Sequence, residues 1–278
     1  MLTIGHSYIL NVVKDVEFGF YVDAENMGEV LLPTRYCPTG LSVDDHLPVF
    51  LYLDSDDRPI ATTQEPKTEV GQFSYLMVVD NTDFGTFLDW GLEKDLLVPF
   101  GEQHVPMEVG HSYLVYTYVG IKDGRILASS KIDKFLDDEK PHDFKPRQRV
   151  NLIIANSTDL GFKAIINHSH WGVLYRNEVH ERLSFGQYKN GFIKFIRPDG
   201  KIDLSLDGGQ QLRDKNMNTV ITHLKKQDGF SSVHDKSDPR EIQSIFGMSK
   251  KSFKKAIGTL YKQRAIVIER DGIRLNEE

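Results

Sequence analysis

Phe84 and Phe87 lie on either side of Gly85, and Arg125 follows farther along the chain. Aromatic side chains can stack against flat rings such as nucleobases, and a guanidinium group can bind a phosphate. These three residues therefore have the types needed to bind a single nucleic-acid strand. The alternative is that at least one of the aromatic side chains fills a protein interior, as side-chain alternation along a strand would produce.

The same arrangement occurs three times. Gly19, Gly85 and Gly161 are each followed 38 residues later by an aspartate and 41 residues later by an isoleucine. A fixed spacing without insertions indicates three homologous domains. The candidate binding residues of the first copy are Phe18 and Tyr21. Those of the third copy are Phe162, Lys163, Tyr175 and Lys201, with Arg176 as a further cation.

Short apolar runs separated by Gly, Asp, Asn or Pro predict strands and turns in each copy. In the second copy the strands are expected near residues 72–80, 85–90, 95–99, 112–119 and 125–130. Five strands in about 65 residues fit a small closed barrel of the OB type. The glycine at the start of each second strand is expected to allow sharp coiling or the close approach of another backbone.

The turn between the fourth and fifth strands differs among the copies. The second and third copies have "KDGR" and "PDGK", whereas the first has "DDRP", so a different turn is expected there. Asp54, Asp56 and Asp57 crowd this first turn and would repel phosphate.

From about residue 210 the apolar residues follow a helical period. Asp238 before Pro239, and Ser249 before a lysine-rich run, have the pattern of helix starts. Helical spacing is shown by Val220, Ile221 and Leu224, and one face of the third helix carries Phe253, Ile257, Leu260 and Tyr261. A type I′ turn at Asp271 and Gly272 would join two final strands. Three helices and a hairpin predict a winged helix, so the fold class is mainly β with a C-terminal α+β domain.

The third helix of this winged helix is basic. Its candidate nucleic-acid contacts are Lys250, Lys251, Lys254 and Lys255. Base edges in a groove are usually read by side chains such as Arg, Asn or Gln, in which this helix is poor, so contact with phosphates is expected. The alternative is a winged helix that is purely structural or binds a protein.

Charge is distributed unevenly along the 278 residues. The net charge of −6 divides into −14 for residues 1–140 and +8 for residues 141–278. A polyanion would favour the basic rear part, although solvated faces that differ by chance would give the same count. The acidic first domain is expected to contact a protein partner or to limit nonspecific binding.

The composition predicts a cytoplasmic protein without a membrane segment or a secretion signal. The single cysteine, Cys37, excludes an intrachain disulfide. We considered zinc binding by His168, His170 and His180 and set it aside because no further ligand completes the group. A calcium loop is rejected because Pro59 occupies a position that requires glycine. No catalytic motif is found, and no cofactor or metal is expected.

The pattern F-G-x-F, an apolar triplet and then D-G-[RK]-I resembles the RNA-binding domain first described in ribosomal protein S-one. The resemblance implies RNA contacts by the two aromatic residues, by a residue that closes the third strand and by the basic residue of the hairpin. Phe84, Phe87 and Arg125 match this pattern. In the first copy Pro59 stands at the basic position, and in the third copy Leu160 and Lys163 replace both aromatics.

Three such domains before a winged helix, with "LNVVKDVEFGFYVDAENMGEVLLP" and "SKKSFKKAIGTLYK", resemble the conserved virulence factor B (CvfB/YitL-like) family over essentially the whole chain. The resemblance implies a bacterial RNA-binding protein that influences gene expression, with no known catalytic step. The expected domains are residues 1–66, 67–135, 146–208 and 210–278, with a linker at 136–146.

Two hypotheses compete with binding of single-stranded RNA. One is a DNA-binding transcriptional regulator that reads an operator with its winged helix. The other is a protein-interaction scaffold without a nucleic-acid role.

Overall fold

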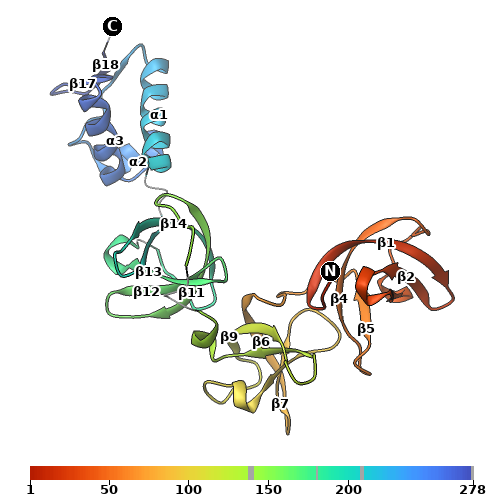
Figure 1. Ribbon diagram of the computed structural model, residues 1–278. Coiled ribbons are helices and arrows are strands. Elements are labelled where there is room, and N and C mark those ends of the chain that lie inside the picture. Colours follow the sequence, from red (N-terminus) through yellow and green to blue (C-terminus); the bar gives the residue numbers. More distant parts are fainter. Residues whose placement is uncertain (137–140, 180, 207–209, 277–278) are drawn as a thin grey trace. The chain divides into compact units, whose positions relative to one another are not determined.

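The computed structural model describes residues 1–136, 141–179, 181–206 and 210–276. It contains three closed five-stranded barrels, then three α-helices and a three-stranded sheet (Figure 1). The chain divides into two compact units. The first holds most of residues 1–204, and the second holds residues 145–149, 191–194 and everything from Ser205 onward. The predicted fold class is confirmed.

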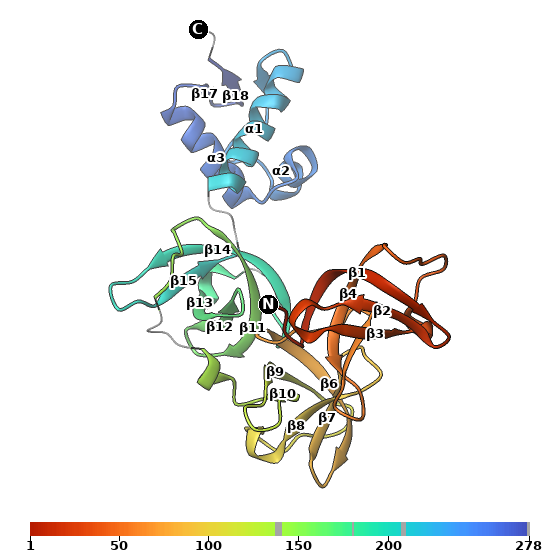
Figure 2. The ribbon, with the colours of Figure 1, turned by 45° about the vertical axis from the view of Figure 1, so that its right-hand side comes forward.

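The first barrel has the strand order β1-β2-β3-β5-β4. The third and fifth strands pair in parallel, Leu31 with Ile60, and the other neighbouring strands are antiparallel. Figure 2 labels the first four strands of this barrel. Its strands are β1 (His6–Val16), β2 (Gly19–Asp23), β3 (Glu29–Pro33), β4 (His46–Leu53) and β5 (Pro59–Thr62).

The second and third barrels repeat this topology, with parallel pairs at Leu97 with Leu127 and at Leu174 with Leu204. The second barrel consists of β6 (Phe73–Thr82), β7 (Gly85–Asp89), β8 (Leu96–Pro99), β9 (Ser112–Val119) and β10 (Ile126–Ser129). The third consists of β11 (Arg149–Ser157), β12 (Gly161–Ile166), β13 (His170–Tyr175), β14 (Tyr188–Ile196) and β15 (Ile202–Ser205).

Smaller features also repeat. The first strand of each barrel has a bulge at the equivalent place, after Val12, Val78 and Ile154. A short 3-10 helix follows each third strand; these helices are η2 (Thr34–Tyr36), η3 (Phe100–Glu102) and η5 (Arg176–Glu178). The remaining 3-10 helices are η1 (Glu25–Met27) and η4 (Ile132–Phe135).

The repeated glycine is required by the close approach of two strands. Gly19, Gly85 and Gly161 have φ values of +149°, +146° and +158°. A Cβ atom on them would lie 2.2, 2.3 and 2.0 Å from a carbonyl oxygen of the third strand. Of the two roles expected for this glycine, the approach of another backbone is therefore the one that the structure shows.

The fourth-to-fifth strand hairpins contradict one prediction. In the turns 54–58 and 197–201 the first N–H donates to the last carbonyl, at 2.9 and 2.8 Å, whereas the turn 120–125 closes one residue later, at 2.8 Å. The first and third copies therefore share a turn, and the expectation that the first copy differs is wrong. Asp57 (φ +59°) replaces Gly200 (φ +80°) there, because aspartate tolerates the left-handed conformation better than most residues.

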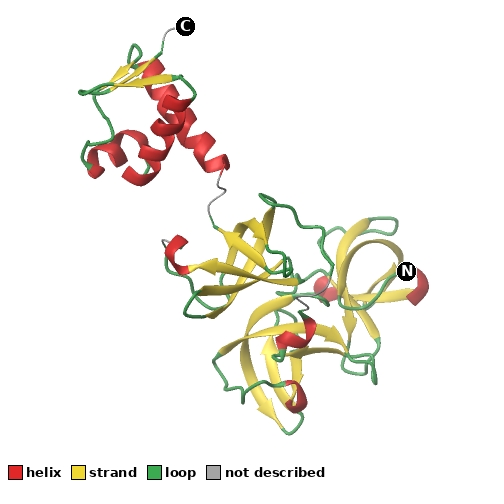
Figure 3. Cartoon of the chain, turned by 60° about the vertical axis from the view of Figure 1, so that its left-hand side comes forward, coloured by secondary structure: helices red, strands yellow, loops and turns green. Residues whose placement is uncertain are grey.

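The second unit contains α1 (Gln210–Lys226), α2 (Pro239–Phe246) and α3 (Lys250–Lys262), with the sheet β16 (Phe230–Ser231), β18 (Ile273–Leu275) and β17 (Ile266–Ile268) (Figure 3). Both predicted caps form. The Asp238 carboxylate accepts the Arg240 N–H at 2.8 Å, and the Ser249 hydroxyl accepts the Ser252 N–H at 3.2 Å. The strand β16 was not predicted because two residues carry no periodic signal.

Two details of this unit concern the predicted helices and hairpin. Of the residues with helical spacing, Val220, Leu224, Phe253, Ile257 and Leu260 are buried and Ile221 is partly buried, whereas the side chain of Tyr261 is exposed. In the final hairpin the Glu269 N–H donates to the Gly272 carbonyl at 2.9 Å, so Arg270 and Asp271 are the central residues. Neither has a positive φ, which excludes the type I′ turn.

Part of the predicted linker lies outside the described residues. Residues 137–140, and the domain boundary expected at residue 208, lie outside the described residues, and residues 141–145 form neither helix nor strand. The domain boundaries stay a prediction. In the described part of the chain, no helix is long and apolar enough to cross a membrane.

Candidate nucleic-acid interface

The structure brings the three candidate residues of the second barrel together. Phe84 lies in the turn before β7, Phe87 lies on β7, and Arg125 immediately precedes β10. All three line one pocket of about 310 Å³. The Phe84 side chain is well exposed (77%), and that of Phe87 is half-buried. Exposed aromatic faces beside a guanidinium form the kind of surface on which bases stack next to their phosphates.

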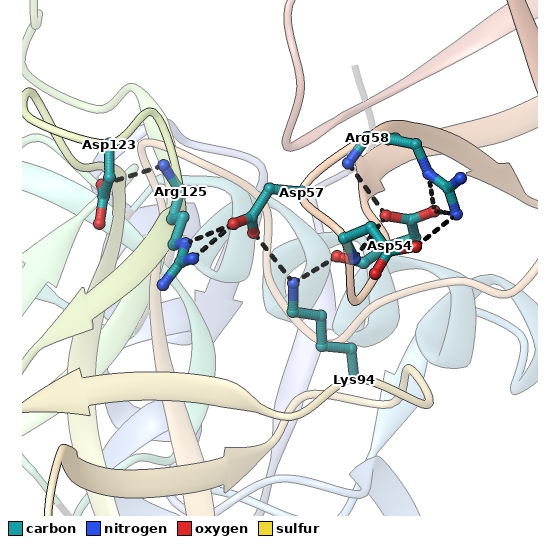
Figure 4. Close-up of polar contacts among 7 residues, drawn as sticks. Asp54, Asp57, Arg58, Lys94, Asp123 and Arg125 are labelled. Atoms are coloured by element: carbon teal, nitrogen blue, oxygen red, sulfur yellow. Dashed lines mark hydrogen bonds and ion pairs between the residues drawn. The ribbon is translucent and has the colours of Figure 1, made fainter.

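Arg125 is already paired with an acid of the first barrel (Figure 4). Its Nε donates to Oδ2 of Asp57 at 3.0 Å, and its Nη2 donates to the same oxygen. Nζ of Lys94 lies 3.6 Å from the other Asp57 oxygen and donates to the Asp54 carbonyl at 2.6 Å. The hydrogen bond from Arg125 holds the pKa of Asp57 below its usual range.

Trp90 fixes the loop that carries Lys94. Its indole N–H donates to the Lys94 carbonyl at 2.5 Å, and its ring packs edge-on against Phe50 of the first barrel, with 5.7 Å between the centroids. Phe50, Tyr52 and Ile60 of the first barrel join the buried cluster of the second. Apolar packing therefore positions the charged groups at this side of the pocket.

Sequence reasoning missed Lys94 and Trp90. Neither belongs to the repeated motif, because both lie in the loop between β7 and β8. The one signal in the sequence was that Lys94 is a cation close to the predicted strand that carries Phe87. The direction in which the Lys94 side chain points depends on the packing of Trp90 against the first barrel, and no local sequence pattern reveals that packing.

The first barrel presents its two aromatic candidates differently. The Phe18 side chain is 57% exposed, and its ring lies edge-on to that of Tyr21 at 6.5 Å. Lys14 of β1 lies 5.6 Å from the centre of the Tyr21 ring, so a cation stands near the aromatic pair. The carbonyl that closes the hairpin belongs to Arg58 here and to Arg125 and Lys201 in the other barrels, so Arg58 occupies the motif's basic position and the assignment of Pro59 to it is wrong.

The acids of the first hairpin do not stand as uncompensated charges. Asp54 and Asp56 each lie 2.8 Å from the Arg58 guanidinium, and Asp57 binds Arg125. Cations therefore partly neutralise each of these carboxylates, and the expected repulsion of phosphate stays a prediction.

In the third barrel the candidate residues are engaged with neighbouring groups. Lys163 lies over the Trp171 ring at 3.9 Å, and Lys201 lies 3.4 Å from Asp199. The Tyr175 hydroxyl donates to Asp203 at 3.3 Å and also bonds Arg197. The ring of Phe162 lies 5.6 Å from the guanidinium of Arg176, a further cation of this copy.

Strand pairing explains why the motif includes the residue that closes the third strand. Pro33, Pro99 and Tyr175 pair directly opposite the three repeated glycines. The residue that closes the third strand is thus held beside the residues that flank each glycine.

The four candidate lysines of α3 separate into two groups. Lys250 donates to the Ser237 carbonyl at 2.7 Å and so holds the loop before α2, and Lys254 lies 3.9 Å from Asp235. Lys251 and Lys255 lie one helical turn apart and are exposed. We therefore expect the latter pair to be more available for phosphate.

The histidines considered as zinc ligands have other contacts. Nδ1 of His168 accepts the Phe73 backbone N–H at 2.9 Å, and the His170 ring lies against those of His142 and Phe144. His180 lies outside the described residues. Within the described ranges, no group of three or more His, Cys, Asp or Glu side chains could hold a metal ion. Cys37 donates to the Pro33 carbonyl at 3.3 Å, and burial raises the pKa of its thiol.

Comparison with known proteins supplies matches at both ends of the chain. Residues 4–64 match the S1 domain model, and residues 218–275 match the CvfB-like winged helix domain model. The resemblance to the conserved virulence factor B family is confirmed. YitL of Bacillus subtilis (strain 168) is 26% identical over 95% of this chain and 91% of its own length.

Two further proteins are similar to this one over most of its length. Conserved virulence factor B of Staphylococcus saprophyticus is 24% identical over 86% of this chain and 82% of its own. A crystal structure from Streptococcus pneumoniae, described as a multidomain protein with nucleic acid binding domains, is 21% identical, covers 98% of both chains and has a TM-score of 0.40.

Proposed function

We propose that this chain is a non-catalytic regulator of gene expression that binds single-stranded RNA through its barrels and its basic winged helix. The S1 and winged-helix domain types support a nucleic-acid-binding regulator. The observation that favours single strands is the pocket shared by Phe84, Phe87 and Arg125. The proposal places the protein in the cytoplasm, where such RNA occurs.

The aromatic residues favour an unpaired strand for a physical reason. A base can stack on an aromatic side chain only when it has left its own helix, and single-stranded segments are where RNA displays bases in this way. Stacking tolerates any base, so we expect little sequence preference from this pocket.

The winged helix contributes phosphate contacts in this proposal. The exposed pair Lys251 and Lys255 supplies charge, and α3 (Lys250–Lys262) has no Arg or Asn and therefore few groups that could read base edges. This composition favours the RNA proposal over a regulator that selects a DNA operator.

The test is fluorescence anisotropy of the full-length protein with labelled poly-U RNA, matched single-stranded DNA and duplex DNA at several salt concentrations. RNA should bind most tightly, and its affinity should fall as salt rises. Preference for duplex DNA would move the function to the winged helix, and absence of binding to all three would favour a protein scaffold.

A pair of variants locates the binding surface. Phe84→Ala together with Phe87→Ala should weaken RNA binding by about ten-fold or more, because each stacked base contributes roughly 1 to 3 kcal/mol. Phe100→Ala is the matched control, since Phe100 is 58% exposed on the same barrel but does not line the pocket. Equal losses in both variants would contradict this placement.

A further inference from the structure

The carboxylate of Asp57 accepts hydrogen bonds from the guanidinium of Arg125 in the second barrel. Arg125, which the motif assigns to phosphate, directs two N–H groups at one Asp57 oxygen, and Lys94 faces the other oxygen (Figure 4). A guanidinium recognises carboxylate and phosphate oxygens through the same paired donors. The first barrel thus fills the phosphate position of the second with its own anion.

The hairpin holds Asp57 in this position. Oδ1 of Asp54 accepts the N–H groups of Asp56 and Arg58, each at 2.9 Å, and the Asp54 carbonyl accepts the Asp57 N–H at 3.1 Å. Asp57 has φ +59° at the turn position that Gly200 occupies in the third barrel. A non-glycine residue in this conformation has an energetic cost. The turn is therefore strained at the residue that carries the carboxylate.

The rest of the pocket has the chemistry of a nucleotide site. Phe84, Phe87 and Leu97 make one part of the lining aromatic and apolar, while Lys94 and Arg125 supply the cations. A volume of about 310 Å³ is at the small end for ligand pockets, which suits one base with its sugar and phosphate.

We propose that this pocket takes one nucleotide of a single-stranded RNA, and that Asp57 competes with its phosphate for Arg125 and Lys94. This inference rests on the proposed function. The base lies against Phe84 and Phe87, and the phosphodiester displaces the Asp57 carboxylate from the two cations. Both barrels therefore belong to one binding site, with Lys94 as a phosphate contact outside the repeated motif.

A phosphate can replace the Asp57 carboxylate at low energetic cost because the ion pair is accessible to water. The side chains of Arg125 and Asp57 are 52% and 35% exposed, and exposed ion pairs contribute little to stability. A phosphodiester bound by both cations can therefore replace the carboxylate without unfolding the hairpin.

The test measures the affinity of the full-length protein for labelled poly-U RNA at fixed low salt. Asp57→Asn should raise the affinity by about five-fold, because it removes the competing charge while keeping a side chain of the same size. Asp56→Asn changes the net charge equally on the same hairpin, but Asp56 pairs with Arg58 and does not line the pocket. It should change the affinity less than two-fold, by the same reasoning.

Lys94→Ala and a combined variant complete the test. Lys94→Ala should weaken binding, and Phe84→Ala introduced into Asp57→Asn should abolish the gain. If wild-type protein binds RNA but Asp57→Asn does not bind more tightly, or if the gain survives Phe84→Ala, the inference is overturned while the proposed function stands. If wild-type protein binds no RNA, the proposed function itself fails.

Discussion

His168 illustrates how one side chain can join two barrels. It lies in the turn between β12 and β13, and its Nδ1 accepts the backbone N–H of Phe73 on β6 at 2.9 Å. This hydrogen bond requires an unprotonated Nδ1. Burial lowers the pKa of His168 below its ordinary value of 6.5.

The lowered pKa predicts that stability falls in mild acid. Above pH 6.5 His168 is neutral in both the folded and the unfolded chain and adds no pH dependence. As the pH falls from 6.5 through the lower pKa of the folded state, the unfolded chain takes up a proton that the folded protein does not, so the free energy of unfolding decreases.

Thermal unfolding followed by circular dichroism between pH 7.5 and 5 checks this expectation. His168→Asn should flatten the acid dependence, because asparagine does not titrate in this range and its side-chain oxygen can accept a hydrogen bond. His111→Asn is the control, since His111 is largely exposed. An unchanged pH profile in His168→Asn would show that other groups cause the dependence.

At the scale of elements, the close pairing of the second and third strands organises every barrel. The repeated glycine lets the third-strand carbonyl approach, and the residues on either side of it are then carried to the surface. Phe84 and Phe87 therefore depend on Gly85 for their placement, although the glycine itself contacts no ligand in our proposal.

Gly85→Ala should destabilise the second barrel by roughly 3 kcal/mol, through backbone strain and overpacking together. Its Cβ would lie 2.3 Å from the Val98 carbonyl oxygen, whereas a Cβ on Gly124 would have no atom within 4 Å. Gly124→Ala, also at positive φ, should therefore cost only roughly 1 kcal/mol.

Urea unfolding monitored by tryptophan fluorescence measures the difference, because Trp90 is buried in the second barrel. Similar midpoints for the two variants would contradict the role assigned to the close approach at Gly85.

At the scale of the whole molecule, charge and aromatic side chains are divided among the domains. The first 140 residues carry a net charge of −14, and the last 138 carry +8. Electrostatic attraction of RNA would thus come mainly from the rear part, while stacking comes from the second barrel. A protein partner for the acidic first domain remains a prediction, now limited to surfaces other than the hairpin that carries Asp57.

The winged helix should contribute to the salt dependence of RNA binding. Lys251→Glu with Lys255→Glu should lower the slope of log affinity against log salt, since each phosphate contact on a single strand contributes about 0.7 to the slope. Anisotropy titrations of the full-length protein at several salt concentrations measure this slope.

One variant controls for charge alone. Lys225 is suitable, because it is exposed and lies on α1 and not on α3, whereas Lys250 is not, because it holds backbone carbonyls of a loop. Lys225→Glu should leave the slope nearly unchanged. The same fall in this variant would mean that net charge, and not the exposed face of α3, governs binding.

The sequence alone determined the three barrels, the winged helix and the proximity of Phe84, Phe87 and Arg125. These features arise from signals that act within one domain: the repeated glycine spacing, strand alternation, and the helix caps at Asp238 and Ser249. Only the tertiary structure decided that Arg125 binds Asp57, that Lys94 faces the same carboxylate, and that Lys250 holds a loop. Asp57 and Arg125 are 68 residues apart, and their contact depends on how Phe50 and Trp90 pack one barrel against the next. Local periodicity carries no information about such packing, because it specifies which side chains are buried and not which surface covers them.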